Sequence, residues 1–480
     1  MLHTSFATRG VLVAVALVAG GCAGIPADRG FDAVDAAVEA HGYEIGAPAS
    51  PPAPAAAADP LLARLADAPL DLDTAQRIAL THHPLLLARY AALGLAQADV
   101  YDAARLSNPR FSLSWLDATG RGALVTLGLA QNLVELLTLS PRRRIATGEL
   151  ARAQQEAAGA LVNLAAEVEA AWVRHVAALG ARDLARAIAD AGRTAADFAA
   201  AVYAAGNINQ LALDRERAAA ETLALDAERA EAEVATTRAT LANLMGLPPD
   251  VDWQAPTALP LPVAAEDDVA TLRRIADAGR LDLLAARREV AVMEDALGLA
   301  RGTRLLGETR LGVEHEREPD GGRLTGPTLE LELPIFNTGA GKVTRAASQL
   351  DAARAQAAAL TLSVANDVAA AAATVQARRA VLDRLRERLL PLRESIVASA
   401  RQMQNYMLIG QFDVLADKLA QYQAYRDYLA ALGEYWVARA SLARAIGAPL
   451  PSGRGAGAVT PATLLDTPAA AHTGHPHPTH

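Results

Sequence analysis

The chain has 480 residues, of which 52% are hydrophobic but only 4% aromatic, and its formal net charge is −9. Alanine dominates the apolar residues, and an Ala-, Arg- and Glu-rich composition is typical of long, closely packed helices. The acidic balance and the lack of a basic block exclude nucleic acid as an expected partner. Cys22 is the only cysteine, so no internal disulfide can form.

Residues 1–21 have the pattern of a secretory signal peptide, with one arginine and then an apolar run too short to span a membrane. The small residues before Cys22 resemble the lipobox of bacterial lipoproteins, which implies lipidation of Cys22. An ordinary signal peptide with a chance cysteine is the alternative. Ala23 follows in place of an aspartate retention signal, so this resemblance implies the outer membrane.

Residues 22–69 are then expected to form a lipidated N-terminus and an extended linker rich in proline and alanine. Two short helices follow. Asp73 is the expected N-cap of a helix over 74–81, and a second helix is expected from Pro84 to about residue 105. His82 and His83 between them are interpreted as a polar joint rather than as metal ligands.

Two pairs of alternating segments predict strands. Phe111, Leu113 and Trp115 alternate with serines, and a matching segment follows a Gly-rich turn. The pattern returns at about 308–316 and 325–335, where Glu330 and Glu332 alternate with leucines. Each strand has about the ten residues that a tilted strand needs to cross a bilayer. The Gly-Ala-Gly-Lys stretch that follows is not a nucleotide loop, because a phenylalanine replaces its first glycine and a valine its final hydroxyl residue.

Long helical segments follow each strand pair. No proline occurs between Arg142 and Leu247, which predicts two long helices joined near Gly206. The second of them has a heptad seam of apolar and small residues. Its members are Leu223, Ala227, Ala230, Val234, Thr237, Leu241 and Leu244.

The same order of segments occurs twice. The segment 274–290 parallels 77–93, and the turn at Gly206 has a counterpart at Gly410. We therefore expect structural repeats at 70–250 and 267–447, joined by a linker at 251–266 and followed by a disordered His-rich tail at 448–480. Four strands cannot close a barrel, and lipid does not tolerate an open sheet edge, so several copies must complete the wall.

These features resemble the TolC-like outer membrane factor family over about residues 70–447. The resemblance rests on the duplication, on "LPIFNTGAGKVTRAA" (333–347), on "YMLIGQFDVLADKLAQYQAYRDYL" (406–429), and on the helix-ending "MGLP" and "IGAP". It implies a mainly α fold with a membrane β-barrel, made of duplicated coiled-coil helices and strand pairs and completed as a trimeric α-barrel/β-barrel tube. Glu330 and Glu332 would face the lumen. The first repeat lacks the junction glycine, and Pro141 is expected to make the same bend.

The resemblance implies a passive exit duct and not an enzyme, with no cofactor. The homotrimer would lie in outer membrane lipid, extend into the periplasm, and work with a periplasmic adaptor and an inner-membrane pump of the resistance–nodulation–division (RND) type. Gly206 and Gly410 would lie at the periplasmic tip. Asp413 and Asp417, with Asp214 as a weaker counterpart, could form an acidic gate ring. N-terminal helix capping is the alternative for Asp413.

The C-terminal tail contains His472, His475, His477 and His480. Neutral imidazoles are good ligands for copper, nickel, cobalt and zinc, which favours heavy-metal cations as cargo. A solvated, disordered end is the alternative for the tail. The same duct for drugs or for type I protein secretion is the second reading of function. A non-conducting structural coiled-coil lipoprotein that buffers metal is the third.

Overall fold

The computed structural model describes residues 25, 26, 28–44, 62, 65, 68–118 and 122–465. Cys22, the signal peptide, most of the predicted linker and the four tail histidines lie outside the described residues. The chain divides into two compact units. Unit 1 draws on 1–34, 89–154 and 285–355, and unit 2 on 35–88, 155–284 and 356–480. Each unit therefore combines parts of both predicted repeats.

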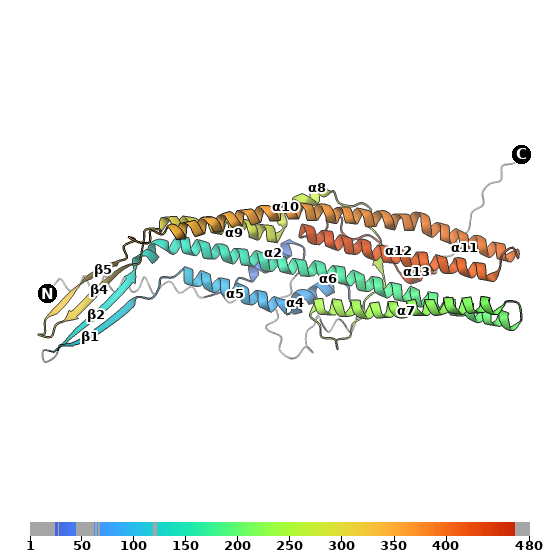
Figure 1. The fold of residues 1–480 in the computed structure, drawn as a ribbon, viewed down its shortest axis with the longest axis horizontal. Coiled ribbons are helices and arrows are strands. Elements are labelled where there is room, and N and C mark those ends of the chain that lie inside the picture. The colour runs from blue at the N-terminus through green and yellow to red at the C-terminus, as the bar shows by residue number, and fades with distance from the viewer. Residues whose placement is uncertain are drawn as a thin grey trace. The chain divides into compact units, whose positions relative to one another are not determined.

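Unit 1 contains an antiparallel four-stranded sheet in the order β1-β2-β4-β5 (Figure 1). Both predicted strand pairs are confirmed, but the last strand ends at Leu331 rather than at Ile335. Pro334 lacks the N–H that would continue the ladder, so the chain leaves the sheet before it. The strands are β1 Arg110–Ala118, β2 Gly122–Asn132, β4 Thr309–Arg317 and β5 Arg323–Leu331.

Helices continue from the sheet in unit 1. A small apolar cluster of Leu297, Ala300, Ala346 and Leu350 joins α9 to the start of α10. Arg354 of α10 also forms an ion pair of 2.7 Å with Glu294 of α9. The helices that contribute to this unit are α5 Leu85–Ala103, α6 Leu133–Ala204, α9 Leu281–Gly302 and α10 Ala340–Arg384.

The expected bend at Pro141 is wrong. Helix α6 begins at Leu133, directly after β2, and Pro141 lies inside the helix. The backbone N–H of Val134 donates to the Asn132 side chain at 3.0 Å, which caps the new helix at its first turn. The chain therefore changes from strand to helix at Asn132, and no glycine is required there.

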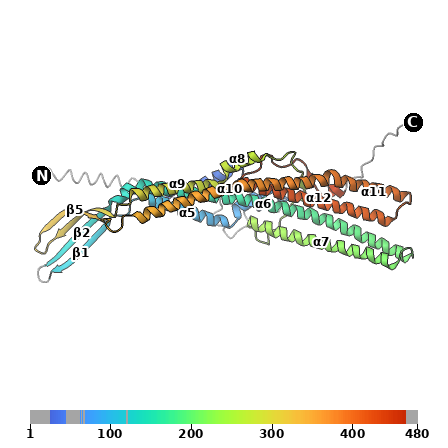
Figure 2. The ribbon, with the colours of Figure 1, turned by 45° about the horizontal axis from the view of Figure 1, so that its top comes forward.

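Unit 2 contains the two long helical hairpins, whose paired helices run side by side in both views (Figures 1 and 2). The predicted turns are confirmed, since one hairpin turns between Ala204 and Gln210 and the other between Asn405 and Gln411. All members of the predicted heptad seam of α7 are buried or half-buried. The further helices are α7 Gln210–Met245, α11 Leu390–Asn405 and α12 Gln411–Ile446.

A π-helical turn interrupts the second hairpin. The turn η2, Leu385–Leu389, connects α10 to α11, and Pro391 follows it in the first turn of α11. Proline cannot donate to the preceding turn, and a π-turn is a usual way to accommodate the missing bond. Within the described chain, the continuous helical segment Ala340–Asn405 is also long and apolar enough to cross a membrane by length and composition alone. An alanine-rich packing helix has the same composition, so this segment is weak support for a helical span.

The core of unit 2 is built around α12. Tyr425, Tyr435 and Trp436 are buried there, and the Trp436 indole donates to the Pro260 carbonyl at 2.8 Å. Two short helices cover this core, α4 Leu72–His82 and α8 Val269–Gly279. A further short helix, α2, spans Asp32–Ala40. The N-cap of α4 is Asp71, which accepts from the Thr74 N–H at 2.7 Å, so the expected cap at Asp73 is wrong.

Disorder was expected from residue 448, and this expectation is wrong for 448–465. Strand β6, Ala458–Val459, pairs with β3, Leu259–Pro260, and the short helix α13, Pro461–Leu465, follows. Arg439 donates to the Ser452 hydroxyl at 2.7 Å and to the Gly453 carbonyl at 2.9 Å. The segment is therefore ordered by partners distant in sequence, which composition alone does not reveal.

Candidate functional site

The strand register gives the sheet one mainly apolar face, which also carries His315, Arg317 and Arg323. Phe111, Leu129, Val313 and Pro327 lie opposite one another across the four strands and therefore share a face. Large side chains on this face, among them Phe111, are exposed. Such a surface needs an apolar environment. The further apolar residues of this face are Leu113, Trp115, Val125, Leu127, Leu311, Leu329 and Leu331.

The opposite face is mainly polar, although Leu116, Leu124 and Leu324 also lie on it. Ser114, Thr126 and Glu316 lie in one cross-strand row, and Ser112 and Glu314 lie in the next. A membrane strand with one apolar and one hydrated face shows this alternation.

The two predicted lumen glutamates differ in position. Glu330 lies on the polar face, where Arg310 donates to its carboxylate at 3.0 Å. Glu332 lies beyond the end of β5, and its carboxylate accepts the Glu308 backbone N–H at 3.1 Å. The carboxylate of Glu332 therefore satisfies the backbone at the edge of the sheet, because the strand is shorter than the alternating sequence predicted.

The sheet has two open edges. Within the described chain, β1 pairs only with β2, and β5 pairs only with β4. Unpaired backbone groups are not tolerated in hydrocarbon, so a membrane location requires these edges to be paired with other strands.

The hairpin turns place the predicted tip residues as follows. Gly206 has a φ of +77°, in the left-handed region, whereas Gly410 is extended and precedes α12 as its N-cap. The Asp413 carboxylate accepts the Gly410 N–H at 2.9 Å. Asp413 is therefore a capping residue, and this alternative from the sequence is confirmed.

The other two predicted tip aspartates are Asp417 and Asp214. Asp417 is half-buried one turn beyond Asp413 in α12. The exposed Asp214 accepts from the Gln210 side chain at 2.8 Å. A gate ring of these residues requires further copies of the chain and stays a prediction.

Sequence reasoning missed one feature of the second turn. Tyr406, Met407 and Leu408 are exposed there, and Met407 is 93% accessible with a φ of +61°. The left-handed region is unfavourable for a side chain with a Cβ. The sequence suggested that Gly410 would adopt the left-handed conformation of this turn. Met407, three positions earlier, adopts it instead.

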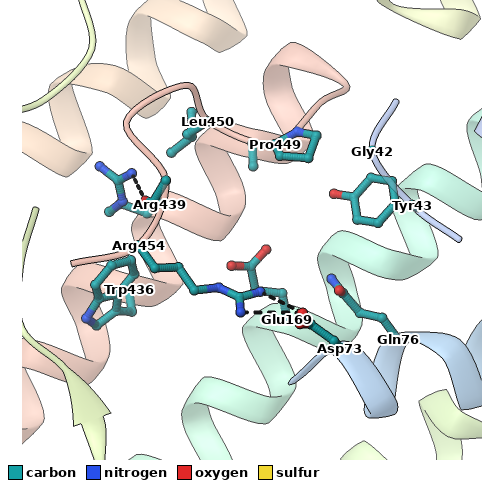
Figure 3. Close-up of a pocket in the computed structure, with 12 residues that line it drawn as sticks. Gly42, Tyr43, Asp73, Gln76, Glu169, Trp436, Arg439, Pro449, Leu450 and Arg454 are labelled. Carbon is teal, nitrogen blue, oxygen red and sulfur yellow. Dashed lines mark hydrogen bonds and ion pairs between the residues drawn. The ribbon is translucent and has the colours of Figure 1, made fainter. Parts of the chain in front are cut away.

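Unit 2 also encloses a cavity of about 210 Å³ between α4, α6 and the chain after α12 (Figure 3). Arg454 reaches the Asp73 carboxylate at 3.3 Å, beside Glu169. Burial raises the pKa of the Glu169 carboxyl, and the nearby Arg454 and Arg439 oppose this increase. No local motif identified these residues, because Asp73 and Arg454 are 381 positions apart.

An ionic cluster lies next to this cavity. Glu266 accepts from the Tyr435 hydroxyl at 2.6 Å and from Arg439, which is only 3% exposed. Arg379 lies 3.5 Å from the same carboxylate. Because Arg439 also binds the 452–453 backbone and side chain, the cluster attaches the C-terminal segment to α12. Among the described residues, no group of three or more His, Cys, Asp or Glu side chains is placed to hold a metal ion.

No family model matches the chain, and no curated protein matches it either. Solved structures do. The channel protein CusC superposes with a TM-score of 0.65 at 16% identity, covering 78% of this chain and 92% of its own. The outer-membrane channel OprN superposes with a TM-score of 0.64 at 20% identity, and the match covers 84% of this chain and 96% of OprN. The outer membrane protein VceC of Vibrio cholerae superposes with a TM-score of 0.64 at 17% identity, and the match covers 79% of this chain and 96% of VceC.

At sequence identities this low, a structural match shows the fold alone. The match covers most of this chain and nearly all of each of these proteins. The chain therefore has the fold of outer membrane channel proteins, and the resemblance to the TolC-like outer membrane factors that its sequence indicated is confirmed at the level of the fold.

Proposed function

We propose that this protein is the outer membrane channel of a tripartite efflux system. The observation that supports this function best is the sheet, whose exposed apolar face and polar opposite face suit a strand wall between lipid and water. The long helical hairpins would lie in the periplasm, as the resemblance to the TolC-like family implies. The channel is a passive duct, so no catalytic residue is required.

Assembly completes this duct. Three copies would pair the open edges of β1 and β5 and give twelve strands, as the resemblance to the TolC-like family implies. A periplasmic adaptor and an inner-membrane RND-type pump would supply substrate and energy. Lipidation of Cys22 would anchor the N-terminus in the same membrane.

The two faces of β2 offer a direct test. Leu127 and Thr126 are neighbours on opposite faces, so Leu127→Arg places a charge in lipid and Thr126→Arg places it in the lumen. An arginine near the bilayer midplane costs about 2–4 kcal/mol on the lipid face. We expect Leu127→Arg to reduce outer membrane insertion of the full-length protein, with Thr126→Arg inserting normally. Equal insertion of both variants would contradict the lipid-facing assignment.

Heavy-metal cations are the cargo that we propose, on the basis of His472, His475, His477 and His480. A deletion strain should become sensitive to one or two metals among zinc, cobalt, cadmium, nickel and copper. The full-length gene should restore tolerance, and a gene lacking the four histidines should restore less of it. Drug sensitivity with normal metal tolerance would instead support multidrug export.

The proposed gate ring at Asp413 and Asp417 has a separate test. Removing both carboxylates in each copy should widen the constriction and raise single-channel conductance in planar bilayers. Asp413→Asn with Asp417→Asn is the preferred double variant, because an asparagine can still cap α12. Unchanged conductance would leave Asp413 with its capping role alone.

A further inference from the structure

In unit 1, exposed apolar side chains lie beside cationic ones where the second strand pair passes into α10. Leu333, Ile335 and Phe336 are exposed, and Phe336 is fully so at 101%. Arg304, Lys342 and Arg345 line a common cavity of about 410 Å³, and its lining includes Glu332 and Pro334 on either side of Leu333 in the sequence. Apolar and cationic groups in this order are typical of a membrane–water interface.

The three cations have free capacity for an anion. The Lys342 ammonium donates to the Thr303 hydroxyl at 3.1 Å. Within the described part of the chain, none of Arg304, Lys342 and Arg345 forms an ion pair with a carboxylate. Glu332 is the one acidic residue of the lining, and its carboxylate is engaged by the Glu308 N–H. The cavity therefore has an excess of positive charge.

The backbone holds these residues together. Gly339 has a φ of +71°, and a Cβ at this position would collide with the Arg304 carbonyl oxygen. The loop before α10 therefore lies directly against the end of the α9 segment. Asn337 accepts the Gly339 N–H at 3.0 Å and further restrains the loop. The cavity is consequently part of the fold rather than a chance gap between mobile side chains.

We propose that this cavity binds the phosphodiester headgroup of an anionic phospholipid in the leaflet that faces the periplasm. The guanidinium and ammonium groups would bind the phosphate oxygens, and Leu333, Ile335 and Phe336 would enter the acyl region. This inference rests on the proposed function, since it requires the sheet to lie in a membrane. It also gives the Gly-Ala-Gly-Lys stretch a phosphate ligand without a nucleotide.

The other strand-to-helix junction is similar but weaker. Leu136 and Leu137 are exposed at the start of α6, and Arg143 and Arg144 follow about two turns later. There Arg144 is paired with Asp295 at 2.9 Å. The headgroup site is expected at the second junction, because three cations line one cavity there.

The test compares two triple variants of the full-length protein. Arg304→Gln, Lys342→Gln and Arg345→Gln together remove the cavity charges. Arg193→Gln, Arg215→Gln and Arg217→Gln remove three exposed arginines from the first hairpin and serve as the matched control. Delipidated protein in detergent is titrated with phosphatidylglycerol, phosphatidylcholine or inorganic phosphate, and bound lipid is measured by native mass spectrometry.

Wild type and control should prefer phosphatidylglycerol to phosphatidylcholine. The cavity variant should bind phosphatidylglycerol roughly a hundredfold more weakly, since each cation near a membrane surface contributes on the order of 1 kcal/mol. Unchanged phosphatidylglycerol binding by the cavity variant overturns the proposal. Inorganic phosphate that competes as well as the lipid overturns it too, because the cavity would then be a site for free anions.

Insertion of wild type into vesicles, measured with the same preparations, separates this inference from the proposed function. Failure to insert contradicts the channel, whereas insertion without a preference for phosphatidylglycerol contradicts only the headgroup site. Melting curves of the two triple variants show whether they fold. If the cavity variant misfolds, Lys342→Gln alone should still weaken binding about fivefold, and unchanged binding by that variant overturns the proposal.

Discussion

Helices α7 and α12 occupy equivalent places in the two repeats, yet they are buried very differently. Both have 36 residues and both end at a left-handed glycine, Gly246 or Gly447. The buried residues of α7 are only Leu213, Thr237, Leu241 and Met245. In contrast, α12 buries an aromatic core that includes Tyr425, Tyr435 and Trp436. The two helices therefore agree in length and in how they end, but α12 buries far more of its surface than α7.

The composition of the two helices accounts for this difference. Helix α7 is built from Ala, Arg and Glu with a narrow seam, whereas α12 has large aromatic and aliphatic side chains on several sides. A narrow stripe is enough for contact with one neighbour, and a wide apolar surface requires burial on several sides. The exposed flank of α7 is consequently the surface that we expect neighbouring copies to cover in the proposed trimer.

Truncation of one leucine in each helix should give the largest difference. Leu432 of α12 is 0% exposed, and Leu225 of α7 is 51% exposed. Leu432→Ala should destabilise the protein by about 2–5 kcal/mol through a cavity in the core. Leu225→Ala should change the stability of the protomer by less than about 0.5 kcal/mol.

Thermal melting in detergent gives both effects, and the fraction of assembled protein after dilution shows whether Leu225→Ala weakens assembly. Reduced assembly with a stable protomer would support α7 as the surface between copies. Similar losses of stability for Leu225→Ala and Leu432→Ala would contradict the comparison.

The buried end of α7 should be sensitive to acid. His175 of α6 is buried beside Thr237, whose hydroxyl lies 3.1 Å from the imidazole, and its ring contacts Trp253 edge-on. Burial, together with the positive charges of Arg238 and Arg182, lowers the pKa of His175 to about 4. Below its ordinary pKa of 6.5 the unfolded chain binds a proton that the folded chain excludes.

The contribution of neutral His175 is therefore complete above pH 6.5 and is lost as the pH falls towards 4. The loss reaches at most about 3 kcal/mol. His175→Gln should remove this acid sensitivity, so its melting temperature should fall less than that of wild type between pH 6.5 and pH 4. Parallel curves for the two proteins would show that His175 does not titrate in this range.

Glu169 should give the opposite dependence at the α12 side of the core. Burial raises the pKa of its carboxyl, and Arg454 and Arg439 oppose this only in part. Above its ordinary pKa of 4.5, the folded state holds the proton more tightly than the unfolded state, so this group destabilises the fold as the pH rises through the raised pKa.

Glu169→Gln should accordingly raise the melting temperature at pH 8, and the gain should disappear below pH 4.5. Asp250 is an exposed carboxylate away from this cavity and serves as the control, since Asp250→Asn should give no gain at pH 8. A loss of stability for Glu169→Gln at pH 8 would mean that the attraction of the two arginines exceeds the cost of burial.

The sequence predicted the fold from signals that lie within short windows. The alternation around Leu113 and Leu329 gave both strand pairs, and the glycines at 206 and 410 gave both hairpin turns. The sequence placed Glu332 on the lumen face of a strand because the alternation of apolar and polar residues continues past Leu331. The strand ends at Leu331, before Pro334, so Glu332 lies outside it. The cavity at Glu169 and the ordered segment 448–465 could not be predicted, since they depend on contacts between residues hundreds of positions apart.

The two hairpin turns should give the smallest effects, and they are opposite in sign. The left-handed residue of the first turn is Gly206, which has open space around it, whereas Met407 fills this role in the second turn with a φ of +61°. A left-handed conformation costs a residue with a Cβ about 1–2 kcal/mol relative to glycine. Gly206→Ala should therefore destabilise its hairpin by about 1 kcal/mol.

Met407→Gly should relieve the strain of the second turn, although part of the gain is offset because glycine makes the unfolded chain more flexible. Hydrogen exchange of the amides beside each turn resolves changes that a global melting curve would miss, because helix ends open locally. We expect protection to fall at the start of α7 in Gly206→Ala and to rise by up to about 1 kcal/mol at the start of α12 in Met407→Gly. If Met407→Gly lowers protection instead, the methionine side chain stabilises the turn through contacts that outweigh its backbone strain.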